Sequence, residues 1–156
     1  MRQKQNTDGY GIAEALKETF GTGFAGRDVW IFGAGGAARG ISVQALASGC
    51  RRLAVVNRTS DRLERLCGDL QAGGASAECR FLTTAAVTAD ADPRALLINA
   101  TSLGLREGDA IPIPPSFLSA GRDVYDTTYG FSNALRHACG EVGCHYADGL
   151  SMLVWQ

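Results

Sequence analysis

The amino-acid sequence predicts a three-layer α/β domain with a mostly parallel sheet of about six strands. Short apolar runs at 29–32, 53–56 and 95–98 are typical of strands that are buried on both faces. Amphipathic helical patterns lie between these runs, and a regular alternation of strands and helices favours a parallel sheet. The chain of 156 residues has the length of one domain, which we take as residues 1–156.

A glycine-rich turn follows the first apolar run. Gly33, Ala34, Gly35, Gly36 and Ala37 stand between this strand and a helix, as in the dinucleotide-binding fingerprint of Rossmann-type domains. Gly33 allows a tight turn, and Gly35 lets a pyrophosphate approach the backbone. The start of the helix presents free N–H groups to the phosphates. The alternative is a turn that only joins a strand to a helix.

The end of the second strand, 53–56, carries the signal for the choice of cofactor. NAD-binding domains place an acidic residue here to hold the ribose 2′-hydroxyl, whereas this chain has Asn57, Arg58 and Thr59. A guanidinium group suits a 2′-phosphate, and the hydroxyls of Thr59 and Ser60 add donors or cap the next helix. The sequence therefore favours NADP(H). The alternative is a capped helix beside a solvated arginine.

Polar residues also follow the fourth strand, 95–98. Asn99, Thr101 and Ser102 stand at its carboxyl end, where open parallel sheets bind ligands, although they could form only a polar turn. A fifth strand is expected at 122–126, followed by Thr127 and Tyr129.

The remaining elements follow from periodicity and capping residues. We expect a frayed start at 1–5, then a helix with Ile12, Leu16 and Phe20 on one face, capped by Thr7 or Asp8. The other expected elements are helices at about 36–48 and 63–70, a short strand at 78–82, a weak helix or loop at 83–92, an extended connection at 105–119, a helix with Phe131, Leu135 and Ala138 on one face, a strand at 143–146 and a final helix capped by Asp148.

Composition excludes several classes of protein. The 15 basic and 16 acidic residues give a net charge of −1, so no nucleic-acid partner is expected. No apolar run has the length of a membrane span and no signal peptide is recognised, so we expect a cytoplasmic protein without a membrane partner. The five cysteines form no Cys-x-x-Cys pair and suggest reduced thiols. A metal site of Cys139, Cys144, His137 and His145 fits no usual zinc spacing, and none is expected.

Six motifs, in order along the chain, resemble those of the shikimate dehydrogenase family. They are Asn6-Thr7-Asp8-Gly9, the glycine turn with Ala38 and Arg39, Asn57-Arg58-Thr59, Asn99-Ala100-Thr101-Ser102-x-Gly104, Asp126-x-x-Tyr129 and Asp148-Gly149-Leu150-x-Met152-Leu153-Val154-x-Gln156. Each motif is weak alone, but together they are specific. The resemblance implies an NADP-dependent reduction of 3-dehydroshikimate to shikimate, a hydroaromatic substrate of aromatic amino acid biosynthesis.

The resemblance also implies roles for individual residues. Asp8 would contact substrate hydroxyls and share proton transfer with a catalytic lysine, and Tyr129 and Gln156 would approach the substrate. Thr127 and Gly149 would lie near the nicotinamide. The expected cofactor-binding set is Gly33, Ala34, Gly35, Gly36, Ala37, Asn57, Arg58, Thr59, Arg62, Asn99, Thr101, Ser102, Thr127 and Gly149.

The chain departs from the family pattern in ways that bear on activity. In the family an amino-terminal substrate domain carries the catalytic lysine, but here Lys4 and Lys17 are the only lysines and neither has that context. We therefore expect the nucleotide-binding half of such an enzyme, with 1–9 as the junction to the substrate domain and little turnover alone. A quinate/shikimate dehydrogenase relative and a stand-alone NADP-binding regulatory module remain alternatives. The apolar residues at 150–155 make self-association possible.

Overall fold

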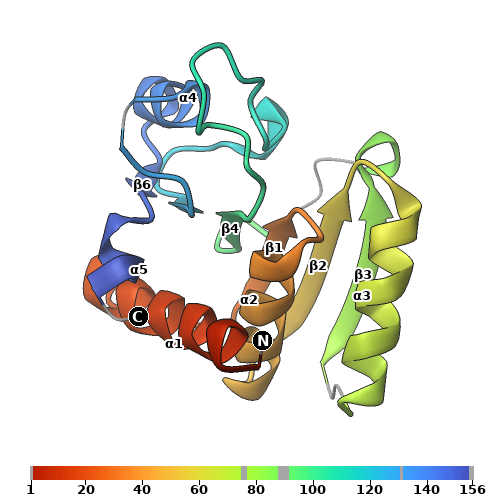
Figure 1. The fold of residues 1–156 in the computed structure, drawn as a ribbon. Coiled ribbons are helices and arrows are strands. Elements are labelled where there is room, and N and C mark those ends of the chain that lie inside the picture. Colours follow the sequence, from red (N-terminus) through yellow and green to blue (C-terminus); the bar gives the residue numbers. More distant parts are fainter. Residues whose placement is uncertain (1, 75–76, 88–91, 131, 155–156) are drawn as a thin grey trace.

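A computed structural model describes residues 2–74, 77–87, 92–130 and 132–154, with side chains described from Gly9 onward. The helices are α1 (Arg2–Phe20), α2 (Gly36–Ala47), α3 (Ser60–Ala72), α4 (Ala134–Val142) and α5 (Leu150–Val154), with short 3₁₀ helices η1 (Thr84–Ala86) and η2 (Pro115–Phe117). The strands are β1 (Asp28–Phe32), β2 (Arg52–Asn57), β3 (Glu78–Thr83), β4 (Leu96–Asn99), β5 (Asp123–Asp126) and β6 (His145–Ala147). Figure 1 shows their arrangement.

The six strands form one parallel sheet in the order β3-β2-β1-β4-β5-β6. The predicted fold class is confirmed. The chain first builds outward from β1 to β3 and then returns to the other side of β1 with β4. The point between β1 and β4 is therefore the topological switch point, outside which doubly wound sheets bind their ligands.

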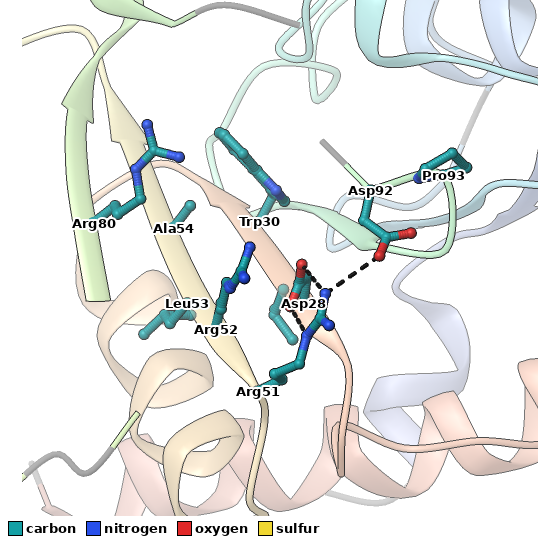
Figure 2. A pocket seen from close by; sticks show the side chains of 10 residues that line it. Asp28, Trp30, Arg51, Arg52, Leu53, Ala54, Arg80, Asp92 and Pro93 are labelled. Carbon is teal, nitrogen blue, oxygen red and sulfur yellow. Dashed lines mark hydrogen bonds and ion pairs between the residues drawn. The ribbon is translucent and has the colours of Figure 1, made fainter. Parts of the chain in front are cut away.

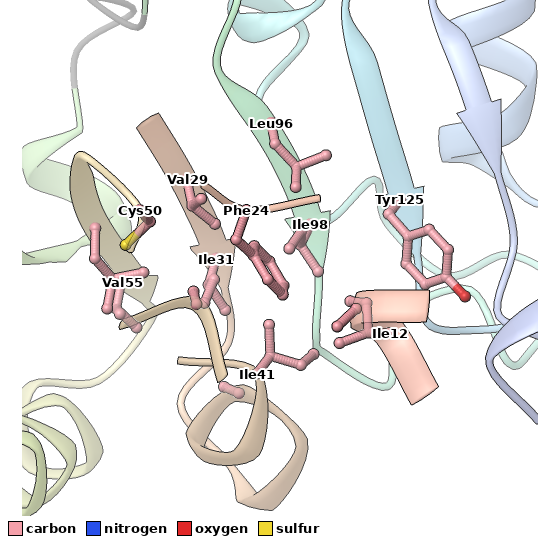
Figure 3. Packing of buried hydrophobic residues seen from close by; sticks show 14 of the residues in the cluster. Ile12, Phe24, Val29, Ile31, Ile41, Cys50, Val55, Leu96, Ile98 and Tyr125 are labelled. Carbon is pink, nitrogen blue, oxygen red and sulfur yellow. The ribbon is translucent and has the colours of Figure 1, made fainter. Parts of the chain in front are cut away.

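Alternate residues of the central strands pack into two separate cores. Val29 and Ile31 point to the face that α1, α2, α3 and α5 cover, and Figure 3 shows this core around Ile12, Ile41 and Ile98. Trp30 and Phe32 point to the opposite face. There they pack with Phe117 of η2, at ring-centroid distances of 5.0 and 5.6 Å, and with the α4 side of the core. Burial on both faces explains why these strands read as unbroken apolar runs.

The start of the chain differs from the prediction. Helix α1 already begins at Arg2, so the expected frayed segment is helical and Thr7 and Asp8 lie inside a helix rather than at its N-cap. Arginine, glutamine and lysine are good helix formers, and 2–5 consists of these residues. The capping pattern of Asn6 to Gly9 was therefore misleading, and the helix runs through it.

Other boundaries shift by smaller amounts. The last strand is His145–Ala147 rather than 143–146, and the extended 105–119 connection includes the turn of η2. The weak element expected at 83–92 is η1, followed by residues that lie partly outside the described part. Phe131 also lies outside it, and α4 starts at Ala134 with Asn133 as its N-cap. The predicted cap of α5 is confirmed, because the N–H of Leu150 donates to Asp148 Oδ1 at 3.1 Å.

Candidate functional site

A cleft of about 740 Å³ opens at the carboxyl ends of the central strands. It lies over the switch point between β1 and β4, where a ligand is expected. Its walls come from segments that are far apart in the sequence but end at the same edge of the sheet. They are Phe32, Gly33, Ala34, Gly35, Gly36, Ala37, Val56, Asn57, Arg58, Arg62, Thr84, Ala100, Thr101, Ser102, Leu103, Ala110, Ile111, Pro112 and Thr127.

The glycine turn lines the middle of the cleft, and its first two glycines have different roles. Gly33 has φ +120°, and a Cβ there would lie 2.8 Å from the carbonyl oxygen of Ala100. Gly35 is the N-cap of α2 in an extended conformation, and a Cβ there would meet nothing within 4 Å. Gly33 thus permits a tight backbone crossing, whereas Gly35 leaves open space in front of the helix start. Free N–H groups in the first turn of α2 make that space suitable for an anion.

Two arginines form the β2 side of the cleft. Arg58 follows β2 and Arg62 lies in the first turn of α3, and both are exposed. No ion pair joins either guanidinium to an acidic group within the described part of the chain. Asn57 Nδ2 donates to the carbonyl oxygen and to Oγ1 of Thr59, at 3.1 and 3.2 Å, and so fixes the turn that carries Arg58. Thr59 therefore supports the turn and does not itself line the cleft.

The segment after β4 forms the other wall. Asn99 is fully buried, and its Nδ2 donates to the Leu103 carbonyl at 3.0 Å and to Asp126 Oδ1 at 2.9 Å. Its Oδ1 accepts from the N–H and the hydroxyl of Thr101, at 2.9 and 2.6 Å. Both amide hydrogens are thus used inside the fold. Asn99 shapes the loop that presents Thr101, Ser102 and Leu103 and is not itself a wall of the cleft.

Asp109 closes the far end of this loop. Its Oδ2 accepts the N–H groups of Gly104 and Arg106, at 2.9 and 3.1 Å. These hydrogen bonds, that of Gly104 first, hold the pKa of the Asp109 carboxyl below its ordinary value. The carboxylate therefore keeps its charge, and these two hydrogen bonds, to a lower pH than an ordinary aspartate would.

Thr127 and Gly149 lie together although they are far apart in the sequence. The N–H of Gly149 donates to the carbonyl oxygen of Thr128 at 3.0 Å. A Cβ at Gly149 would overlap the carbonyl group of Thr127, with the carbonyl carbon only 2.8 Å away. Because Thr127 lines the cleft, Gly149 fixes the backbone behind this part of the wall.

Of the three residues expected to approach the substrate, the structure describes the side chain of Tyr129 alone. Tyr129 is 45% exposed and lies two residues beyond Thr127, outside the lining of the cleft. The side chain of Asp8 and the whole of Gln156 lie outside the described residues. Their expected roles stay predictions.

Sequence reasoning missed one wall of the cleft. Ala110, Ile111 and Pro112 also line the cleft, as does Thr84 of η1. The proline-rich run at 111–115 was a usable signal, because a stiff extended segment that begins with apolar residues is suited to form a fixed wall.

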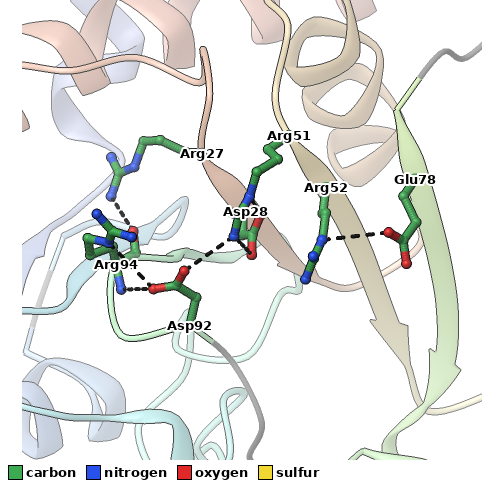
Figure 4. Close-up of polar contacts among 7 residues, drawn as sticks. All are labelled: Arg27, Asp28, Arg51, Arg52, Glu78, Asp92 and Arg94. Atoms are coloured by element: carbon green, nitrogen blue, oxygen red, sulfur yellow. Dashed lines mark hydrogen bonds and ion pairs between the residues drawn. The ribbon is translucent and has the colours of Figure 1, made fainter.

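A second hollow, of about 470 Å³, lies at the opposite ends of β1 and β2 (Figure 2). Four of the five charged residues that line it, Asp28, Arg51, Arg52 and Asp92, are paired. Arg51 donates to both carboxylate oxygens of Asp28 at 2.8 Å and also reaches Asp92, and Arg52 pairs with Glu78 at 3.6 Å (Figure 4). This hollow therefore holds a network of ion pairs that joins loops and strand ends, and we do not regard it as the functional site.

The parallel sheet, the glycine turn at the switch point and the open helix start define a Rossmann-type nucleotide-binding domain. Comparison with known proteins narrows this class. The family model for shikimate / quinate 5-dehydrogenases matches residues 14–102, which is more than half of the chain. The chain therefore belongs to the shikimate / quinate 5-dehydrogenase family.

Individual relatives agree with this assignment. The chain is 41% identical over 155 residues to the shikimate dehydrogenase (NADP(+)) of a species of Acidovorax and 34% identical over 154 residues to that of Moorella thermoacetica, in each case over 97% of this chain. It spans about half the length of these curated relatives, 53% and 52%. Among solved structures, shikimate 5-dehydrogenase from Listeria monocytogenes in complex with shikimate and NAD matches with a TM-score of 0.81 and 26% identity, over 96% of this chain and 54% of that chain.

Within the described part of the chain, no helix combines the length and apolar character needed to cross a bilayer.

Proposed function

We propose that this chain binds NADP(H) in the cleft and forms the nucleotide-binding part of an enzyme that reduces 3-dehydroshikimate to shikimate. The observation that carries the proposal is the pair of exposed arginines, Arg58 and Arg62, at the carboxyl end of β2 beside an open glycine turn. A free guanidinium group at this position suits a phosphate on the adenosine ribose. The named activities of the Acidovorax and Moorella relatives support the same cofactor and substrate.

The geometry fits a dinucleotide along the whole cleft. Gly35 leaves space for the pyrophosphate in front of α2, and the two arginines stand at the adenosine side on β2. Thr101, Ser102 and Thr127 stand on the β4 and β5 side, which the strand order separates from the arginines by β1. Bound NADPH would supply a hydride to the substrate carbonyl. The chain's own residues would bind the cofactor and hold its second nucleotide half against this wall.

Acid–base chemistry is not supplied by the described lining of the cleft. Its side chains include no aspartate, glutamate, histidine, lysine, tyrosine or cysteine. We propose Asp8, Tyr129 and Gln156 as residues that approach the substrate, with proton transfer completed by groups outside this cleft. An acid–base group contributes about 10²–10⁴-fold to a rate, so the chain alone should turn over near background.

Two measurements on the purified chain test the proposal. Titration with NADPH, followed by the fluorescence of the reduced nicotinamide, should show saturable binding that 2′,5′-ADP displaces. Absence of binding would overturn the proposed function. Shikimate-dependent reduction of NADP⁺ should be undetectable with the chain alone. It should appear when the part of the Acidovorax enzyme that this chain does not match is added as a separate protein. Robust turnover by the chain alone would contradict the proposal that proton transfer also needs a group supplied by the part of the enzyme that this chain does not match.

A further inference from the structure

A fully buried carboxylate lies behind the cleft without touching it. Asp126 is the last residue of β5, and it accepts five hydrogen bonds. Its Oδ1 accepts from Asn99 Nδ2 at 2.9 Å and from the N–H and hydroxyl of Thr128 at 3.0 and 2.8 Å. Its Oδ2 accepts from Asn133 Nδ2 at 2.9 Å and from the Tyr146 hydroxyl at 2.8 Å. Within the described part of the chain no lysine or arginine forms an ion pair with it.

A buried charge of this kind is costly unless it is fully hydrogen-bonded, and its hydrogen bonds are then stronger than those of neutral partners. Packing alone does not require the charge, because apolar residues in place of the carboxylate and its side-chain donors together could fill the same space. The carboxylate therefore calls for a role that an apolar side chain cannot fill. Only an acceptor with two oxygens can join five donors from different segments.

The Oδ1 side leads to the cleft. The Asn99 side chain, which donates to Oδ1, also bonds to Thr101 and to the carbonyl oxygen of Leu103. Both Thr101 and Leu103 line the cleft. The N–H of Thr127 donates to the carbonyl oxygen of Asn99 at 3.0 Å. Asp126 Oδ1, which accepts from both Asn99 and Thr128, therefore joins the loop after β4 to the loop after β5.

The Oδ2 side reaches α4 through Asn133 and β6 through Tyr146, and Asn133 Nδ2 also donates to Thr128 Oγ1 at 3.1 Å. Asn133 caps α4, since its Oδ1 accepts the N–H of Arg136 at 2.9 Å, and Tyr146 belongs to β6. Burial raises the pKa of Tyr146, and its contact with Asp126 raises it further, so the hydroxyl keeps its proton and remains a donor. Of the two hydroxyl donors, that of Thr128 thus belongs to the segment after β5 beside the cleft, whereas that of Tyr146 ties the carboxylate to β6.

We propose that Asp126 is a positioning residue for the second nucleotide half of the cofactor. Its Oδ1 holds Asn99, and Asn99 in turn holds Thr101, Leu103 and Thr127 at the end of the cleft that lies away from Arg58 and Arg62. This inference rests on the proposed binding of NADP(H). It deepens that proposal by assigning the geometry of this end to a residue that does not contact the ligand.

Two variants can be compared, because each removes one hydroxyl donor from one oxygen of the carboxylate; Thr128→Val also removes an acceptor of Asn133 Nδ2, which keeps its contact with Oδ2. Thr128→Val removes the hydroxyl at Oδ1, and Tyr146→Phe removes the hydroxyl at Oδ2. Asp126→Asn removes the charge and replaces one acceptor oxygen by an NH₂ group, which then faces the donors that the oxygen had bound. The probes are NADPH and 2′,5′-ADP, which contains the adenosine half alone. The readout is the ratio of the two dissociation constants. A general loss of structure would weaken the binding of both probes and leave this ratio nearly unchanged.

We expect Asp126→Asn to weaken NADPH by about tenfold and Thr128→Val by about threefold, with 2′,5′-ADP changed less than about twofold in each. Tyr146→Phe should leave the ratio unchanged even if it lowers the melting temperature. If Asp126→Asn does not fold, the comparison of Thr128→Val with Tyr146→Phe decides alone.

The inference is overturned if Thr128→Val and Tyr146→Phe change the ratio equally, or if folded Asp126→Asn leaves it unchanged. Failure of the unsubstituted chain to bind NADPH would instead refute the proposed function.

Discussion

Gly33 and Gly35 allow the clearest separation of folding from binding in this protein. They stand two residues apart in one turn, but the structure surrounds them differently. At Gly33 a new Cβ would meet the Ala100 carbonyl oxygen at 2.8 Å and its carbon at 2.9 Å, and φ is +120°. At Gly35 φ is −90° and a Cβ meets no atom within 4 Å. Substitution should therefore damage the fold at Gly33 and the site at Gly35.

The expected loss of stability in Gly33→Ala has two sources. A non-glycine residue in this backbone region costs about 1–3 kcal/mol, and a contact with backbone atoms that cannot move aside costs about 1–3 kcal/mol more. A loss of about 3 kcal/mol would lower the melting temperature by roughly 6–12 °C in a domain of this size. Gly35→Val should change it by no more than about 3 °C, because the extended backbone at Gly35 suits valine and its Cβ has open space.

Calorimetry for unfolding and titration with NADPH for binding test the pair. Gly35→Val should fold normally but lose NADPH binding by at least about a hundredfold, since its methyl groups occupy the space that a pyrophosphate needs. Retained NADPH affinity in folded Gly35→Val would show that this turn is not the phosphate site. A melting temperature of Gly33→Ala equal to that of the unsubstituted chain would refute the packing argument.

Two further predictions concern the surface and the thiols. Leu150, Leu153 and Val154 of α5 are 59, 42 and 76% exposed, so the chain should self-associate at high concentration. Sedimentation should show this for the unsubstituted chain and for Val43→Asp on α2 but not for Val154→Asp, and a strict monomer throughout would contradict it. Burial raises the pKa of Cys50 from 9.0 to about 11 and that of Cys139 from 9.0 to about 12. As the pH rises, the unfolded chain loses these protons before the folded chain does, so the free energy of unfolding should fall above pH 9. Cys50→Ala should make this fall smaller. A free energy of unfolding that does not change above pH 9 would contradict the prediction.

The fold was predictable because its signals are local. Strands buried on both faces give unbroken apolar runs, as at 29–32 and 95–98, and the helices between them keep the pattern of one apolar stripe. Parallel pairing then follows from the alternation of strands and helices. The predicted start of α1 was wrong because it, too, was taken from a local signal. Asn6 to Gly9 is a good local cap signal, but the segment before it continues the helix.

The site was predictable as far as it depends on residue type at a strand end. Arg58, Thr101 and Thr127 reach the cleft because parallel strands all end at one edge of the sheet. Asn99 and Asp126 show where this reasoning stops. Both stand at strand ends, yet they point into the fold and bond to each other at 2.9 Å. Nothing local in the sequence separates a polar residue that faces a ligand from one that holds the backbone behind it.

The central claim is that the arginines at the end of β2 read the 2′-phosphate of NADP(H). The most direct measurement compares the dissociation constants of NADPH and NADH for the unsubstituted chain, for Arg58→Ala and for Arg65→Ala. Arg65 is a matched control because it is an exposed arginine of α3 that does not line the cleft. We predict tighter binding of NADPH, with a preference that shrinks as the salt concentration rises. Arg58→Ala should weaken NADPH by about 1.5–3 kcal/mol and leave NADH nearly unchanged, whereas Arg65→Ala should affect neither. Equal losses for both cofactors in Arg58→Ala, or no preference in the unsubstituted chain, would contradict the account.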